Sequence, residues 1–107
     1  MIEKPSTINV LGIEYKVQYV DKPSDVDIFK RESLWGQCDH WTRSIRVYDN
    51  GERPIQDLWR TVLHEVLHAI ALTVHIDEKF NDEDNLVDLI ATALVDVVVR
   101  NGWMEIE

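Results

Sequence analysis

The residues from 55 to 74 are apolar on nearly every side when they are read as a helix. A helix on a protein surface shows one apolar stripe, whereas a helix that is apolar all round has to be covered by other elements. Pro54 stands at the favoured first position of such a helix. The sequence therefore predicts a central, buried helix over about residues 54–75, around which the rest of the chain must pack.

The middle of this helix carries the segment 64–68, with the sequence His-Glu-Val-Leu-His. Two imidazoles four residues apart share one face of a helix and can bind a single metal ion, and Glu65 then lies beside any water on that ion. This is the HExxH pattern of zinc-dependent peptidases, in which the histidines are ligands and the glutamate is the general base. Burying three such polar groups without a partner is costly, and a cation removes most of that cost. The alternative is a pair of core histidines that bond to backbone carbonyls.

A catalytic zinc site normally has three protein ligands, so His64 and His68 need a third. His75 falls one residue later than the third histidine of the long metzincin motif, and Ala71 stands where that motif has a glycine. A partly cationic ring is favourable at the C-terminal end of a helix, and this capping role suits His75 better than the role of ligand.

Asp82, Glu83 and Asp84 cluster at the start of a second predicted helix, which covers about residues 82–100. With about 100° per residue and Val87 at the centre of the apolar stripe, Glu83 lies roughly 40° to one side and Asp84 roughly 60° to the other. Both acids can therefore face the first helix and supply the third ligand. The alternative is ordinary first-turn charge that complements the helix dipole.

The part of the chain before Pro54 predicts a sheet. Alternating apolar residues, interrupted by turn signals, indicate four strands, at 8–11, 13–20, 34–40 and 44–48. The first two flank Gly12 in a hairpin, and the segment 21–33 is either a loop or a short helix. The expected fold class is α+β: a minimal zincin-like domain over residues 1–107, with a small antiparallel N-terminal sheet packed on the two main helices.

The net charge of −9 comes from 20 acidic and 11 basic residues. This charge repels a phosphate backbone, so nucleic-acid binding is not expected. The acids keep the surface soluble, and a negative field could also concentrate a metal cation or a basic protein substrate.

The length of the chain and its apolar pattern bear on the number of domains and on the cellular location. A chain of 107 residues suits one domain, and no apolar run is long enough to span a membrane. The first five residues lack the basic and apolar regions of a secretory signal, and the single thiol of Cys38 cannot form an internal disulfide. We therefore expect a cytoplasmic monomer that has no membrane partner.

Two further segments precede the motif helix: Trp-Gly-Gln at 35–37 and Ser-Ile-Arg-Val at 44–47. With the motif segment 61–70, they make most of the chain resemble small phage and prophage zinc-peptidase-like proteins and, more distantly, the ImmA/IrrE-type metallo-endopeptidases. The motif helix is the specific part of this resemblance. The resemblance implies a phage or prophage protein in the bacterial cytoplasm, with a protein or peptide substrate such as a phage repressor.

The resemblance also suggests which residues form the site. Matching Ile90 and Ala91 to the hydrophobic-Ala pair of the family places its ligand glutamate at Asp84, which is one methylene shorter. It thus implies a Zn²⁺ ion held by His64, His68 and Asp84, with Glu83 as the alternative third ligand.

The implied reaction is peptide hydrolysis by a metal-activated water, with Glu65 as the general base. In zincins an edge strand often holds extended substrate, and the segment 44–48 is the candidate here. Tyr48, His40 or Arg46 could stabilise the oxyanion, although a structural role is the more common one for such residues. Two alternatives remain: a non-catalytic phage accessory or interaction protein in which a metal staples two helices, and a metal-free helical adaptor.

Overall fold

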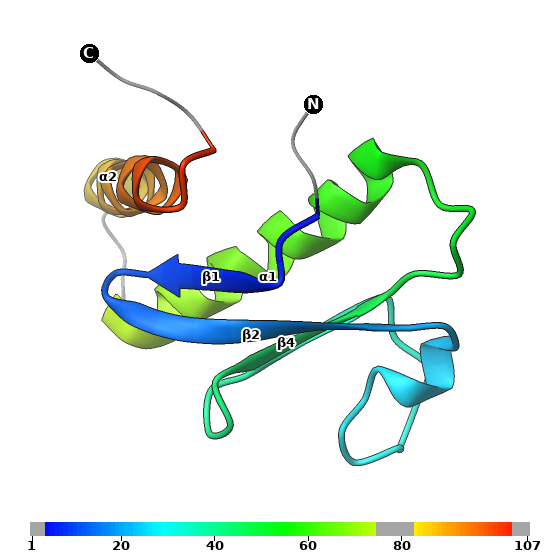
Figure 1. Ribbon diagram of the computed structural model, residues 1–107. Helices are drawn as coiled ribbons and strands as arrows, with labels where there is room; N and C mark the ends of the chain where they lie inside the picture. The colour runs from blue at the N-terminus through cyan, green and yellow to red at the C-terminus, as the bar shows by residue number, and fades with distance from the viewer. Residues whose placement is uncertain (1–3, 75–82, 104–107) are drawn as a thin grey trace.

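The computed structural model describes residues 4–74 and 83–103, and it describes no side chain at 74 or at 83–88. All four strands precede the two main helices along the chain, as the sequence predicts, and the fold is α+β (Figure 1). The elements are β1 (Thr7–Val10), β2 (Ile13–Val20), the short 3-10 helix η1 (Pro23–Asp25), β3 (Gly36–Asp39), β4 (Ser44–Tyr48), α1 (Ile55–Val74) and α2 (Glu83–Arg100).

The four strands form one mixed sheet in the order β1-β2-β4-β3. β1 pairs antiparallel with β2 and β3 pairs antiparallel with β4, but the central strands β2 and β4 run parallel. The prediction of an antiparallel sheet is wrong for this central pair. The long connection through η1 and β3 returns the chain so that β4 enters the sheet in the direction of β2. β4 is therefore an inner strand, and the prediction that 44–48 forms an edge is also wrong.

The turn between β1 and β2 needs backbone angles that most residues avoid. Leu11 has a φ of 53° and Gly12 a φ of 91°, the positive pair that a two-residue hairpin turn requires. The Asn9 side chain accepts a hydrogen bond from the Gly12 amide at 2.8 Å. This turn sets the register in which Ile8 lies opposite Tyr15.

Both helices pack on the same hydrophobic cluster, and α2 lies on the β1 side of the molecule (Figure 1). α1 contacts β1, β3 and β4, whereas α2 contacts β1 and α1. The cluster is built from alternate residues of the strands and one face of each helix: Ile8, Val10, Tyr15, Val17, Ile45, Val47, Leu58, Val62, Val66, Ala69, Ile70, Ala93 and Val97. The alternating apolar residues of the strands and the apolar faces of the two helices thus form one hydrophobic core.

α1 is not covered all round, contrary to the sequence prediction. Its buried residues face the core, but Leu67 and Leu72 are exposed. A four-stranded sheet and one further helix cover only part of the surface of a twenty-residue helix. Within the described residues, no helix combines the length and apolar character that a membrane crossing requires.

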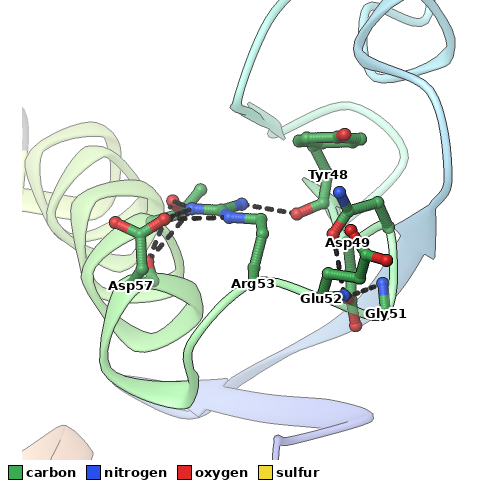
Figure 2. Close-up of polar contacts among 8 residues, drawn as sticks. Tyr48, Asp49, Gly51, Glu52, Arg53 and Asp57 are labelled. Atoms are coloured by element: carbon green, nitrogen blue, oxygen red, sulfur yellow. Dashed lines mark hydrogen bonds and ion pairs between the residues drawn. The ribbon is translucent and has the colours of Figure 1, made fainter.

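Arg53 connects the end of β4 to the first turns of α1, as Figure 2 shows. Its guanidinium pairs with the Asp57 carboxylate at 2.8 Å and donates to Thr61 Oγ1 at 2.8 Å. It also donates to the Tyr48 carbonyl. The Arg53 side chain is almost completely buried, so these bonds satisfy a charge that would otherwise be costly to bury.

Candidate metal centre

His64, Glu65 and His68, called the trio below, lie close together within about one turn of α1. Their potential ligand atoms are all within 4.8 Å of one another. The two imidazoles point toward each other, with 3.2 Å between His64 Nε2 and His68 Nε2. Residues four apart on a helix are neighbours on its surface, so the helix itself produces this arrangement. The trio lies close enough together to bind a metal ion.

The distance between the two ring nitrogens fits a shared metal ion. Two nitrogens that each lie about 2.0–2.1 Å from one tetrahedral zinc are about 3.3 Å apart. A direct hydrogen bond at 3.2 Å would need a proton on one Nε2 and none on the other. Neither ring is bonded to a backbone carbonyl in the described part of the chain, so the geometry differs from that of two ordinary core histidines.

The members of the trio differ in exposure. Glu65 is only 5% exposed, as predicted for a residue in an apolar environment, whereas His64 and His68 are both exposed. The prediction that the histidines are buried is wrong, because β3 covers α1 at Glu65 and leaves the imidazoles open. Solvent and a ligand can therefore reach both rings.

Glu65 is covered by the first residue of β3. A Cβ atom on Gly36 would lie 3.0 Å from Glu65 Oε2 and 2.7 Å from the Thr61 methyl group, so only glycine allows this approach. Burial raises the pKa of Glu65, and the charges of His68 and His64 act in the opposite direction. A carboxyl with a raised pKa is better matched to proton transfer near neutral pH than an exposed one.

Two cavities meet at Glu65, and both are also lined by Gly36, the first residue of β3. The first, which we call the Trp35 cavity, measures about 360 Å³ and is lined by Trp35, Gly36, Arg60, Thr61, His64 and Glu65. The second measures about 350 Å³ and is lined by Gly36, Gln37, Cys38, Glu65, His68, Ala71 and Leu72. A third, of about 690 Å³, runs along α1 and shares His64 and Arg60 with the first. The trio is thus open to ligands from several sides.

The structure describes no side chain of the acids and of His75, the residues considered as third ligand. His75 and Asp82 belong to the segment 75–82, and Glu83 and Asp84 are described only as backbone at the start of α2. The choice between Asp84, Glu83 and His75 stays a prediction. Cys38 is half-buried, as expected for a strand residue, and does not join the metal-binding group. Burial, together with the charge of Glu65, raises the pKa of its thiol to about 12.

The three oxyanion candidates have structural contacts. Arg46 donates to the Val26 carbonyl and to Gln18, and it lies on the face of the sheet away from α1. His40 Nδ1 is 3.1 Å from the Tyr15 hydroxyl. Tyr48 packs edge-on against Trp35 with 5.5 Å between ring centroids. None of the three lines the cavities at the trio that the described residues form.

Three residues beside the trio were given no site role by the sequence: Trp35, Gly36 and Arg60. Arg60 stands one helical turn before His64, and this spacing alone could have drawn attention to it. Trp35 and Gly36 belong to a segment that contributes to the family resemblance, but they are distant from the trio in sequence, so only the packing of β3 on α1 shows that they lie beside it.

Comparisons of the chain with protein-family models, with curated proteins and with solved structures found no match. The resemblance to the phage and ImmA/IrrE-type peptidases therefore stays a prediction. The chemistry of the site rests on the geometry of the trio.

Proposed function

We propose that the protein is a zinc-dependent metallopeptidase, in which His64 and His68 bind the ion and Glu65 is the general base. The observation that carries this proposal is the 3.2 Å separation of the two Nε2 atoms, next to a buried carboxylate at the junction of two cavities. A site that only stapled helices together would have no use for such a carboxylate. An acid from the start of α2, with Asp84 ranked before Glu83, completes the ligand set.

Each residue of the trio has a distinct task in hydrolysis. A bound Zn²⁺ supplies Lewis acidity, which lowers the pKa of a water molecule and polarises the scissile carbonyl. Glu65 accepts a proton from the attacking water while the water oxygen forms its bond to the carbonyl carbon. As the carbon–nitrogen bond breaks, the carboxyl returns that proton to the leaving amine. The close contact with Gly36 holds Glu65 in place for both transfers.

The free edge of β3 is the candidate platform for an extended substrate, in place of the segment 44–48. β3 pairs with β4 on one side and, among the described strands, has no partner on the other. It starts at Gly36, beside Glu65, and includes Cys38, which shares a cavity with His68. An extended peptide that pairs with this edge would lie along the trio.

The first experiment measures metal. Protein purified without chelator or metal-affinity resin should contain about one zinc per chain and should melt at a higher temperature with zinc than without. His64→Ala and His68→Ala should each abolish both effects, while His40→Ala, which removes a histidine that bonds only to Tyr15 among the described residues, should keep them. The proposal would be contradicted if the wild type contained no zinc and if adding zinc did not change its melting temperature.

The same measurement identifies the third ligand. Asp84→Ala, Glu83→Ala and His75→Ala are compared under identical conditions. We expect Asp84→Ala to lose zinc and the other two variants to keep it. Loss with Glu83→Ala or His75→Ala instead would move the assignment to that residue.

The second experiment separates catalysis from a structural metal. Glu65→Gln should keep one zinc per chain but lose cleavage of casein, measured by mass spectrometry of the fragments, by about a hundredfold or more. Cleavage that Glu65→Gln leaves unchanged would exclude Glu65 as the base. A zinc-loaded wild type that cleaves nothing would favour the stapled accessory protein.

A further inference from the structure

We propose that Trp35 and Arg60 form a subsite next to the trio, and that this subsite binds a carboxylate of the substrate. The inference rests on the proposed function and narrows it, because it names a substrate class: peptides that carry a carboxylate close to the scissile bond. The subsite is the Trp35 cavity, which shares His64 and Glu65 with the candidate metal centre.

The indole of Trp35 is exposed yet held in place. It is 62% exposed, and the Arg53 guanidinium lies 4.8 Å from its ring centroid. The Tyr48 ring packs edge-on against it, and the Trp35 carbonyl accepts a hydrogen bond from the Tyr48 amide at 2.9 Å. Arg53 is itself fixed by Asp57 and the Tyr48 carbonyl (Figure 2). A large aromatic surface that is already ordered can bind a ligand with little further loss of entropy.

Arg60 provides a positive charge on the other wall of the Trp35 cavity. It is exposed, it lines this cavity and two neighbouring ones, and it has no ion-pair or hydrogen-bond partner among the described residues. The nearby cation Arg53 is already neutralised by Asp57 at 2.8 Å. In a chain with a net charge of −9, Arg60 therefore places at this cavity a positive charge that no acid of the described residues neutralises.

The Trp35 indole and the Arg60 guanidinium together suit a carboxylate on a short apolar stem. The guanidinium fork suits the two oxygens of a carboxylate, and the methylene stem of an acidic residue can lie on the indole. Of the two charged residues that line the cavity, Glu65 is buried and Arg60 is exposed, so a ligand carboxylate that enters from solvent meets Arg60 first. The carboxylate belongs either to an acidic side chain or to the C-terminus of a peptide, since the two share the same chemistry.

The test is a peptide titration followed by NMR on the ¹⁵N-labelled Glu65→Gln protein, which does not cleave its ligand. Three probes are compared, each in the presence and absence of zinc: acetyl-Ala-Glu-Ala-amide, acetyl-Ala-Gln-Ala-amide and acetyl-Ala-Ala-Ala with a free C-terminus. The indole N–H of Trp35, assigned with Trp35→Phe, and the Nε–H of Arg60 report occupancy. These signals do not depend on turnover.

We expect the Glu peptide to shift both signals and to bind about fivefold more tightly than its Gln counterpart. Arg60→Gln should remove this preference and Arg60→Lys should keep part of it. Lys16→Gln, which removes an equal charge from an exposed position on β2, should leave the preference unchanged. A free C-terminus that binds more tightly than the Glu side chain would assign the carboxylate to chain ends.

The inference would be overturned if the Glu and Gln peptides bound equally tightly and the peptide with a free C-terminus bound weakly. It would also be overturned if the NMR shifts were centred away from Trp35. Failure of the proposed function looks different. If the peptides bind with the carboxylate preference but the wild type holds no zinc, the subsite stands and the metallopeptidase proposal falls. If the wild type binds zinc and cleaves casein but the peptides show no carboxylate preference, the metallopeptidase proposal stands and the subsite falls.

Discussion

Asp27 is a fully buried carboxylate beside β3. It accepts hydrogen bonds from the Phe29 amide at 3.0 Å, the Arg31 amide at 3.2 Å and Gln37 Nε2 at 3.1 Å. The Phe29 bond is the main cause that lowers the pKa of Asp27, from 3.8 to about 2, against the opposing effect of burial. This residue anchors the loop before β3, and thereby the strand that covers Glu65.

Asp27→Asn should destabilise the protein at neutral pH, because the amide is a weaker acceptor for the two backbone N–H groups. Since the folded pKa lies below the unfolded one, the ionised carboxylate stabilises the fold above about pH 4 and loses this effect as the pH falls toward 2. The difference in melting temperature between wild type and variant should therefore shrink over that interval. Asp25→Asn, at a half-exposed carboxylate, serves as the control; a difference that is constant with pH would contradict the assignment.

At the scale of elements, the contact between β3 and α1 determines the shape of the site. The strand approaches the helix at Gly36, which faces Thr61 and Glu65 one helical turn apart. Farther along, Cys38 lines a cavity with His68. Because the contact is closest at Glu65, the general base is buried while the imidazoles on either side stay open.

Gly36→Ala should cost about 1–3 kcal/mol of unfolding free energy, because its Cβ would overlap the Thr61 methyl group. Thr61→Ser removes that methyl but keeps the hydroxyl that accepts from Arg53. The double variant should therefore recover part of the loss in a urea titration. Additive losses from the two substitutions would show that Gly36 acts in some other way than by this contact.

At the scale of the whole molecule, the two edges of the sheet differ in how their backbone hydrogen-bonding groups are covered. At the β1 edge, Asn101 after α2 accepts from the Asn9 amide and donates to the Asn9 carbonyl, both at 2.8 Å. This side chain completes the hydrogen bonds of an otherwise open strand. β3, at the opposite edge and beside the trio, lacks such a cover among the described residues. In the part of the chain that the structure describes, Asn101 thus covers one edge of the sheet, whereas the edge next to the candidate site has no such cover.

Asn101→Asp should destabilise the protein by about 1–3 kcal/mol, because a carboxylate would face the carbonyls of Asn9 and Val97 to which the amide now donates. Asn50→Asp adds the same charge where only an acceptor is used, toward the Glu52 amide, and should cost little. Urea unfolding measures both. Hydrogen exchange of the Asn9 amide should accelerate in Asn101→Asp alone; equal effects of the two variants would point to net charge as the cause.

Local patterns in the sequence were sufficient for the elements and for the histidine pair. The predicted strands 13–20 and 44–48 coincide with β2 and β4, and the predicted first helix coincides with α1 to within a residue at each end. A helix of known pitch also places His64 beside His68 wherever that helix packs. These features depend on residues a few positions apart, so a single chain segment contains the information.

Tertiary structure decided what depends on distant segments. The parallel pairing of β2 with β4 follows from the path of the intervening connection, and it made β3 rather than β4 the edge beside α1. The burial of Glu65 against Gly36, the exposure of both histidines and the bonds between Asn9 and Asn101 join residues far apart in the sequence. Periodicity shows that a residue has a neighbour on its own element, but only the packed chain shows which other element covers it.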